Sequence, residues 1–163
     1  MNTKTLAVNG IVAALYVVIS FIIQPIAFGR FQFRVPEIFN HLIVFNKKYF
    51  FGIVIGVFLA NLFFSPMVAY DLVFGVGQSA ISLLITMATS RFIKTTWARM
   101  LVNTVVFTIT MFLIALELHL AFHLPFIATW LVTAIGEFAV LVIGAPIMYL
   151  INKRVDFEKI IEA

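Results

Sequence analysis

The sequence predicts an all-α integral membrane protein in which one domain, residues 1–163, forms a bundle of six transmembrane helices. Hydrophobic residues make up 63% of the chain and charged residues only 11%, and the mean hydropathy is +1.12. Globular domains are about 45–50% apolar and about 25% charged, so this chain cannot cover its apolar residues with a polar surface. The apolar residues lie in long continuous runs, which favours helices over barrel strands of roughly ten alternating residues.

Six apolar runs mark the expected helices. The first run follows a single lysine and is longer than the core of a signal peptide, so we expect it to remain as a helix. The first, fourth, fifth and sixth runs can cross a hydrocarbon core, which takes roughly 20 residues. The second and third runs are short, and they fit either two spans in a thinned region or two arms of a re-entrant hairpin. The runs cover about residues 6–27, 35–45, 49–64, 71–90, 99–117 and 125–151.

The distribution of positive charge favours six crossings over the hairpin. If all six helices cross and the N-terminus is cytoplasmic, every Lys and Arg except Arg30 and Arg34 lies on the cytoplasmic side. If residues 35–45 do not cross, Lys47 and Lys48 move to the outside and the bias weakens. Because positive residues concentrate in cytoplasmic loops, we predict a multi-pass protein of the cell membrane with both termini in the cytoplasm.

Arg30 and Arg34 would lie on the outer side, where basic residues are rare, and a local ion pair explains only Arg34. Arg34 and Glu37 are three residues apart at the expected start of the second helix, where they could form a salt bridge. Pro36 at the first helical position and an acid in the first turn both favour a helix start at this point. A local ion pair does not account for Arg30, which lies in the connection before this helix.

Acidic residues fall within or beside the apolar runs, mostly on the outer side of this topology. Glu37, Asp71 and Glu117 stand at outer helix ends, and Glu137 lies near mid-membrane. A charge at the bilayer centre costs about 2.5–3.5 kcal/mol on insertion scales, so we expect the polar faces to converge on the bundle interior or a watery cavity. At about 100° per residue, the shared faces join Arg34, Glu37, Asn40 and His41; Asp71 and Gln78; Asn103, Thr110 and Glu117; and Trp130 and Glu137.

Small residues mark two further helix faces. Gly52, Gly56 and Ala60 recur every four residues, a spacing that lets helix backbones pack closely. Gly10 and Ala14 form a similar face on the first helix, which could pack internally or contact a partner subunit.

Several kinds of chemistry lack their sequence motifs. The chain has no Cys, which excludes a disulfide framework, a thiol nucleophile and Cys-ligated zinc. It contains no GxxxxGK[ST] phosphate loop, no HExxH motif and no basic run suited to nucleic acid. His119 and His123 are four residues apart and could hold a metal, but histidines near a membrane interface more often only form hydrogen bonds. We therefore expect no enzymatic activity, metal or bound cofactor, although a membrane-embedded enzyme stays open as an alternative.

The segments "FGRFQFRVPEIFNHLIVFNKKYFFGIVIGVFLANLF", "YDLVFG" and "IGEFAVL" together resemble the QueT family, over nearly the whole chain. The most specific parts are the F-R-x-x-E segment, the region of Asn61 and the D-x-x-F-G segment. Members of this family are read as substrate-binding S components of energy-coupling-factor transporters and are linked to queuosine precursors. The chain departs from the family pattern at Pro36 and Ile38, where Ser and Ala are typical, and Asn40 and His41 are also unusual.

The resemblance implies six helices around a ligand pocket in the outer half, closed by the loop between the first two helices. It also implies partners: a transmembrane coupling subunit and two cytoplasmic ATPases, which would use the ATP. The small residues Ala7, Gly10 and Ala14 would contact this module. The lid loop would contain Arg30, Phe31 and Phe33.

We therefore predict a subunit that captures a 7-deazaguanine queuosine precursor outside the cell. In this interpretation Glu37 accepts two hydrogen bonds from the guanine-like edge, a strong contact because the acceptor is charged, and aromatic rings including Phe33 sandwich the heterocycle. One alternative is an S component for another small heterocycle, such as a vitamin, and another is a stand-alone proton-coupled carrier with Glu137 as the proton site. The candidate substrate-binding residues are Glu37, Arg34, Asn40, His41, Asn61, Asp71, Phe74, Gln78, Trp130 and Glu137.

Overall fold

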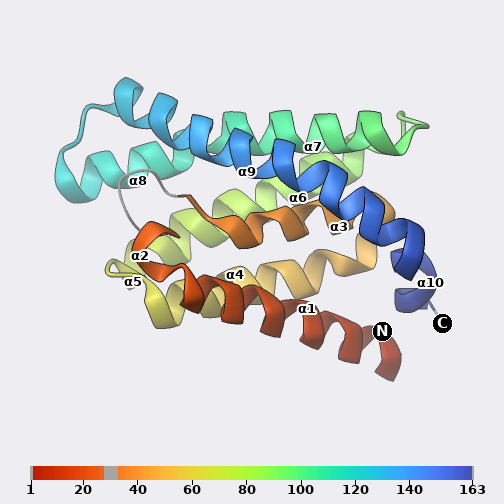
Figure 1. The fold of residues 1–163 in the computed structure, drawn as a ribbon. Coiled ribbons are helices and arrows are strands. Elements are labelled where there is room, and N and C mark those ends of the chain that lie inside the picture. The colour runs from red at the N-terminus through yellow and green to blue at the C-terminus, as the bar shows by residue number, and fades with distance from the viewer. Residues whose placement is uncertain (1, 28–32, 163) are drawn as a thin grey trace.

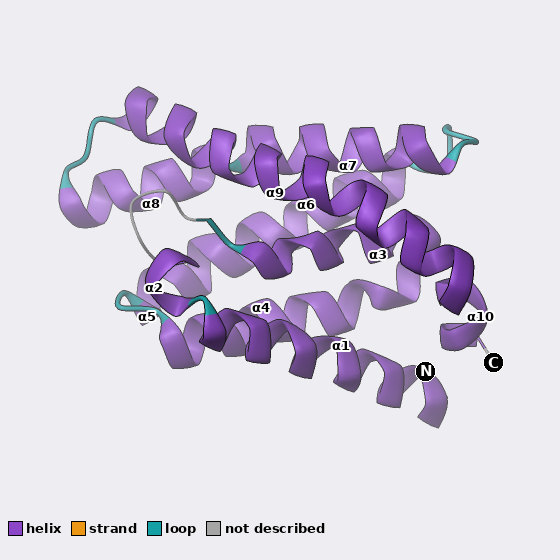
Figure 2. Cartoon of the chain, viewed as in Figure 1, coloured by secondary structure: helices purple, strands orange, loops and turns teal. Residues whose placement is uncertain are grey.

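The structure is a computed structural model that describes residues 2–27 and 33–162. The described residues form helices and connecting turns without a β-strand, which confirms the predicted all-α fold (Figure 2). Arg30 and Phe31 of the expected lid lie outside the described residues. In chain order the helices are α1 (Thr3–Ile22), α2 (Gln24–Ala27), the 3₁₀ helix η1 (Val35–His41), α3 (Leu42–Phe45), the 3₁₀ helix η2 (Lys47–Tyr49), α4 (Phe50–Phe64), α5 (Val68–Tyr70), the π-helical turn η3 (Asp71–Gly75), α6 (Val76–Thr89), α7 (Thr96–Thr110), α8 (Phe112–Phe122), α9 (Phe126–Val155) and α10 (Phe157–Glu162).

Five helical segments of the described chain are long and apolar enough to cross a membrane, and a shorter apolar helix covers Val35–Phe45. Large apolar side chains on these segments face outward, as Phe63, Ile135 and Leu150 do at 65%, 67% and 61% exposure. Apolar exposure along the whole length of the bundle suits contact with lipid. The structure therefore confirms a helical membrane bundle. The five segments are Thr3–Ile22, Lys47–Phe64, Val68–Thr89, Thr96–Phe122 and Phe126–Val155.

The bundle has two distinct ends (Figure 1). Both chain termini and the turn between α6 and α7 lie at one end, which we call the terminal end. The helices α2 and α5 and the connection between α8 and α9 lie at the other, which we call the distal end. The cytoplasmic location of the terminal end stays a prediction from the distribution of Lys and Arg.

The short second run forms the helix pair η1–α3, which contacts α1, α6, α7 and α9 inside the bundle. A 3₁₀ helix rises about 2.0 Å per residue and an α-helix about 1.5 Å, so these 7 and 4 residues extend roughly 20 Å. The pair runs along the bundle towards the terminal end, and α4 runs back beside α1 (Figure 1). Irregular backbone at membrane depth is tolerated here because protein surrounds it.

The predicted small-residue face of α4 packs tightly against α1. A Cβ atom at Gly52 would lie 2.9 Å from the backbone oxygen of Asn9, and one at Gly56 would lie 2.7 Å from Cβ of Tyr16. The Gly52 amide also donates a 2.7 Å hydrogen bond to Oδ1 of Asn9. The close-packing role expected for these glycines is confirmed, and the contact brings Tyr16 into the bundle interior.

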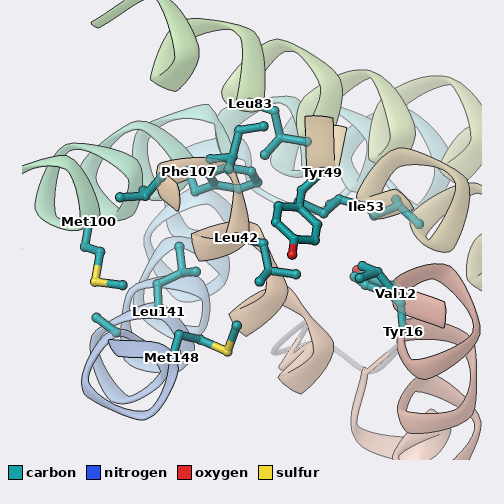
Figure 3. Packing of buried hydrophobic residues seen from close by; sticks show 14 of the residues in the cluster. Val12, Tyr16, Leu42, Tyr49, Ile53, Leu83, Met100, Phe107, Leu141 and Met148 are labelled. Carbon is teal, nitrogen blue, oxygen red and sulfur yellow. The ribbon is translucent and has the colours of Figure 1, made fainter. Parts of the chain in front are cut away.

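The main apolar core occupies the bundle towards its terminal end. Figure 3 shows side chains from α1, α3, α4, α6, α7 and α9 meeting around Leu42 and Phe107. Fully buried members such as Ile53, Leu83 and Leu141 come from different helices. This cluster joins the outer helices to the central pair η1–α3 and supplies a scaffold for the polar residues nearer the distal end.

The C-terminal helix α10 closes the terminal end of this core. Asp156 has a left-handed backbone with φ of 53°, which ends α9 and lets the chain turn back. Ile161 is fully buried, and its carbonyl accepts a 3.0 Å hydrogen bond from the Thr5 hydroxyl. Lys159 forms a 2.9 Å ion pair with Asp156 and, through its hydrogen bonds to that carboxylate, lowers the pKa of Asp156.

Candidate functional site

Arg34 lies at the centre of a buried polar cluster between the core and the distal end. It directly precedes η1 and is 7% exposed. Its guanidinium donates to Oδ1 of Asp71 at 2.9 Å and lies within electrostatic range of Glu37 and Glu117. The ion pair with Asp71 joins η1 to η3, a link that a local salt bridge with Glu37 would not provide.

Asp71 is held by neighbours from three segments. Its two carboxylate oxygens accept hydrogen bonds from Arg34 and from the Ser65 hydroxyl. The amide of Asn61 donates to the Asp71 backbone carbonyl at 3.1 Å. A Cβ atom at Gly75 would lie 2.7 Å from Nδ2 of Asn61, so only glycine leaves room for this arrangement. These contacts orient Asp71 towards Arg34 from a π-helical turn, a distortion that is frequent at functional sites.

Glu37 is held by two neutral donors. The Tyr16 hydroxyl donates to one carboxylate oxygen at 2.5 Å, and the Asn40 amide donates to the other. Glu37 and Asn40 lie one above the other because η1 has three residues per turn. The carboxylate is 2% exposed, so its orientation is set by α1 and η1 before any ligand arrives.

Several acceptors in the same cluster have no hydrogen-bond donor among the described residues. They are Oε1 of Glu137, both carboxylate oxygens of Glu117 and Oδ1 of Asn40. Glu137 lies within electrostatic range of Glu37 and Arg34, and Glu117 within range of Asp71 and Arg34. Buried polar atoms are normally hydrogen-bonded, and exceptions of this kind are candidates for contact with a ligand. The cluster therefore presents acceptors to a molecule with several N–H donors.

His41 lies apart from this cluster, although a shared face with Arg34, Glu37 and Asn40 was expected. One ring nitrogen contacts the Leu141 carbonyl at 2.9 Å, and the other contacts the Asn103 amide at 3.3 Å. The prediction assumed α-helical spacing, whereas η1 is a 3₁₀ helix in which every third residue aligns. His41 therefore turns towards α7 and α9 and connects η1 to them.

Gln78 donates its side-chain hydrogen bonds to α7, and the expected shared face with Asp71 stays a prediction. The Gln78 amide donates to Oγ1 of Thr110 at 3.0 Å, which places it between α6 and α7. The wider π-helical turn η3 changes the register between Asp71 and α6. Met111 separates α7, which holds Asn103 and Thr110, from α8, which holds Glu117, and all three of these residues are buried.

The aromatic candidates have neighbours of their own. Trp130 donates from its indole nitrogen to the Ile109 carbonyl at 3.1 Å and packs in a small apolar cluster with residues of α8. Phe74 stacks on Tyr70 with ring centroids 6.5 Å apart. Phe33, which precedes Arg34 in the sequence, is partly buried. A role for these rings in holding a heterocycle stays a prediction.

The remaining sequence predictions concern the surface and the histidines near the distal end. Ala7, Gly10 and Ala14 are exposed on the outer side of α1, and a Cβ atom at Gly10 would meet no atom within 4 Å. His119 contacts the Leu124 carbonyl at 2.7 Å, and His123 ends α8 in a left-handed conformation. The exposed small residues of α1 leave that face accessible to a partner. The contacts of His119 and His123 place both histidines at the C-terminal end of α8.

The candidate set from the sequence omits Tyr16, Ser65 and Glu117. Tyr16 and Ser65 contact the carboxylates of Glu37 and Asp71, and Glu117 offers two open acceptor oxygens. Glu117 carried a signal, because it is an acid at an outer helix end. Ser65 carried none, since a serine after a helix is common at any turn.

Apolar helices that enclose a buried polar cluster with open acceptors define a multi-pass membrane protein with a candidate binding site in its interior. The family model described as "QueT transporter" matches residues 6–153. The chain is also 36% identical over 167 residues to the queuosine precursor transporter QueT of Lactococcus lactis subsp. cremoris (strain MG1363), covering 97% of this chain and 98% of that protein. The chain therefore belongs to the QueT transporter family, and the resemblance seen in the sequence is confirmed. No solved structure matches it.

Proposed function

We propose that this chain is the substrate-binding S component of an energy-coupling-factor uptake transporter and captures a 7-deazaguanine queuosine precursor from outside the cell. The family supports a membrane transporter, and the name of the Lactococcus lactis relative supports the class of substrate. The observation that carries the proposal is the set of buried acceptors without donors on Glu137, Glu117 and Asn40. A guanine-like edge carries several N–H donors that would complete them.

In this proposal the carboxylates have different roles. Glu37 is oriented by Tyr16 and Asn40, and each of its oxygens keeps a second lone pair for a ligand donor. Glu137 adds a free oxygen from α9. The Arg34–Asp71 pair with Asn61 fixes the start of η1, so it positions Glu37 and Asn40 for the ligand.

The proposed transport cycle assigns the energy source to partners. A transmembrane coupling subunit would meet the exposed small-residue face of Ala7, Gly10 and Ala14, and two cytoplasmic ATPases would hydrolyse ATP. Lys47, Arg91 and Arg99 line one pocket with Glu162 of α10, and Lys48 lies 3.9 Å from Glu162. This concentration of positive charge beside the C-terminal helix supports a cytoplasmic location for the terminal end. The cluster near the distal end would then open to the outside.

Ligand binding to the purified full-length chain in detergent or nanodiscs tests the recognition mode. We expect Glu37→Gln to weaken binding of a 7-deazaguanine about tenfold to a hundredfold, because hydrogen bonds to charged groups contribute about 1.5–3 kcal/mol. Glu158→Gln, an exposed change on α10, is the matched control and should leave affinity unchanged. Equal affinity for Glu37→Gln and the control would contradict the proposed recognition by Glu37.

The stand-alone proton carrier remains a second candidate because Glu137 is 2% exposed and has an unpartnered oxygen. Uptake into vesicles that contain only this chain separates the two candidates. Accumulation driven by a pH gradient without ATPase subunits would favour the carrier. Uptake that requires the coupling subunit and ATP would favour the S component.

A further inference from the structure

A pocket at the terminal end of the bundle, separate from the polar cluster, is lined with basic residues. It has a volume of about 350 Å³, within the range of about 300–1,000 Å³ that is usual for ligand sites. Its walls come from α3, η2, the turn between α6 and α7, α7 and α10. Segments that are distant in the sequence thus bring Lys47, Arg91 and Arg99 to one pocket.

The protein neutralises only part of this positive charge. Glu162 of α10 is the acid that lines the pocket, and it lies 3.9 Å from Nζ of Lys48. None of the three lining cations forms an ion pair with a described residue. The pocket therefore keeps a net positive charge, with three cations against one acid, and this charge attracts an anion.

The hydrogen-bond donors of the pocket suit the oxygens of a phosphate group. Ser90 lines the pocket, and its hydroxyl oxygen has no hydrogen-bond partner among the described residues. Arg99 donates from Nε to the Ile93 carbonyl at 2.8 Å, which holds its side chain beside the turn and leaves its terminal nitrogens for a ligand. Because a guanidinium group offers parallel N–H donors, arginine is well matched to phosphate.

The surface beside the pocket is apolar and suits an acyl chain. Leu84 and Ala88 are exposed on α6, about two turns and one turn before Arg91. Phe92 follows Arg91 and is 87% exposed, and Trp97 at the start of α7 is 48% exposed. Tryptophan is enriched where a membrane meets water, at the level of the lipid headgroups. An acyl chain that lies along α6 would therefore bring its headgroup to Arg91.

We propose that this pocket binds the phosphate group of an anionic phospholipid in the leaflet at the terminal end. Basic pockets between the ends of transmembrane helices are typical sites for acidic lipid headgroups. The inference goes beyond substrate transport, because it assigns a second ligand to a site outside the polar cluster. The bound lipid would link η2, the α6–α7 turn and α7, and would stabilise the packing of this end.

Native mass spectrometry of the full chain tests the proposal with two lipids that share a phosphate group. Phosphatidylglycerol is anionic, whereas phosphatidylcholine carries no net charge. We expect phosphatidylglycerol to bind at least about tenfold more tightly, because each cation near an anionic headgroup contributes about fivefold in affinity. Lys47→Gln combined with Arg91→Gln should bring the two affinities near to equality. Both side chains are exposed, so we expect this variant to fold.

Lys94→Gln combined with Arg154→Gln is the matched control. It removes the same number of charges from exposed positions that do not line the pocket, and it should keep the preference. Equal binding of the two lipids to the unaltered chain would overturn the proposal and leave the pocket to an acidic segment of a partner protein. An equal loss of preference in both double variants would also overturn it, since the attraction would then come from the overall charge of the terminal end. The ratio of two affinities is measured on folded molecules, so a lower yield of one variant does not affect it.

Inorganic phosphate distinguishes a lipid headgroup from a soluble anion. In phosphatidylcholine nanodiscs, replacing chloride by millimolar phosphate at equal ionic strength should leave the thermal unfolding temperature of the chain unchanged. Adding phosphatidylglycerol to the nanodiscs should raise it, because a ligand that binds only the folded state stabilises that state. A rise with phosphate as large as that with phosphatidylglycerol, and lost in Lys47→Gln with Arg91→Gln, would identify a soluble anion as the ligand and overturn the lipid assignment.

Discussion

The terminal and distal regions of the bundle differ in how their buried polar groups are satisfied. Towards the terminal end, Asn9 bonds to the Gly52 amide, Thr5 to the Ile161 carbonyl and Tyr49 to the Phe157 carbonyl. Towards the distal end, Glu117 and Glu137 keep acceptors without donors. Apart from the Ser90 hydroxyl, every unpartnered buried side-chain atom of the described residues belongs to the polar cluster.

This difference separates the residues that hold the fold from those that are available to a ligand. The apolar core and the α1–α4 contact join segments that are distant in sequence, and they do so without ligand. The polar cluster is fixed on one side by the Arg34–Asp71 pair and left open on the other. Substitutions in the two regions should therefore affect stability and binding in different proportions.

The largest expected effect is that of Arg34→Met. Removing one partner of a buried ion pair leaves an uncompensated charge, here on Asp71, and costs about 3–5 kcal/mol. We expect both a lower free energy of unfolding and loss of ligand binding, measured by denaturant unfolding in detergent and by titration. The exposed Arg91→Met at the terminal end is the matched control and should change stability by less than about 0.5 kcal/mol.

The comparison with the control decides this prediction. Equal stability of the two methionine variants would mean that Arg34 does not hold the cluster. If Arg34→Met does not accumulate, Arg34→Lys retains the charge without the planar donor group and should be intermediate in stability. If Arg34→Lys also fails to accumulate, the planar guanidinium group, and not the positive charge alone, is required to hold Asp71.

A smaller effect is expected in the terminal region from Gly52→Ala. The added Cβ would meet the backbone oxygen of Asn9 at 2.9 Å, so α1 must move away from α4. Overpacking of this kind costs about 1–3 kcal/mol. Gly77→Ala is the matched control, because its Cβ would meet no atom within 4 Å, and it should be neutral or stabilise α6 by about 0.5–1 kcal/mol.

Measuring ligand affinity on Gly52→Ala tests whether the α1–α4 contact belongs to the scaffold or to the binding site. Gly52→Ala should lower the thermal unfolding temperature and leave the affinity of the folded protein nearly unchanged. A large loss of affinity with unchanged stability would show that the α1–α4 contact belongs to the site and not to the scaffold.

The sequence predicted the class of fold because membrane helices need long apolar runs, and composition alone reveals these. It also predicted that Arg34, Glu37, Asn61 and Asp71 lie in one region, since acids and amides inside a membrane must find each other. The close packing at Gly52 followed from the spacing of small residues, whereas the helix it packs against, α1, is known only from the structure.

The details that the sequence could not supply depend on local helix geometry. The positions of His41 and Gln78 were predicted with regular α-helical spacing, but η1 is a 3₁₀ helix and η3 is a π-helical turn. Both distortions are stabilised by tertiary contacts, such as Asn61 with the Asp71 carbonyl, and a single sequence shows no pattern for them.

The smallest expected effects come from a matched pair of tyrosines, one in each region. Tyr16 donates to the Glu37 carboxylate in the cluster, and Tyr49 donates to the Phe157 carbonyl at the terminal end at 2.8 Å. Both are at least 98% buried, with exposures of 2% and 1%, and replacement by Phe removes one hydroxyl from each. We expect Tyr49→Phe to lower the free energy of unfolding by about 0.5–1.5 kcal/mol, the contribution of a neutral hydrogen bond, and to leave affinity unchanged.

Tyr16→Phe should lower ligand affinity more than it lowers stability. Without this hydroxyl, Glu37 loses one of the two donors that orient it, and we expect ligand affinity to fall about tenfold, which corresponds to roughly 1.4 kcal/mol. Unfolding in detergent and titration of a 7-deazaguanine, performed on both variants, give the two quantities side by side. Suppose that the two variants lose affinity and stability in the same ratio. The hydrogen bond that orients Glu37 would then contribute no more to binding than the Tyr49 bond at the terminal end. That result would mean that the two regions are not functionally distinct.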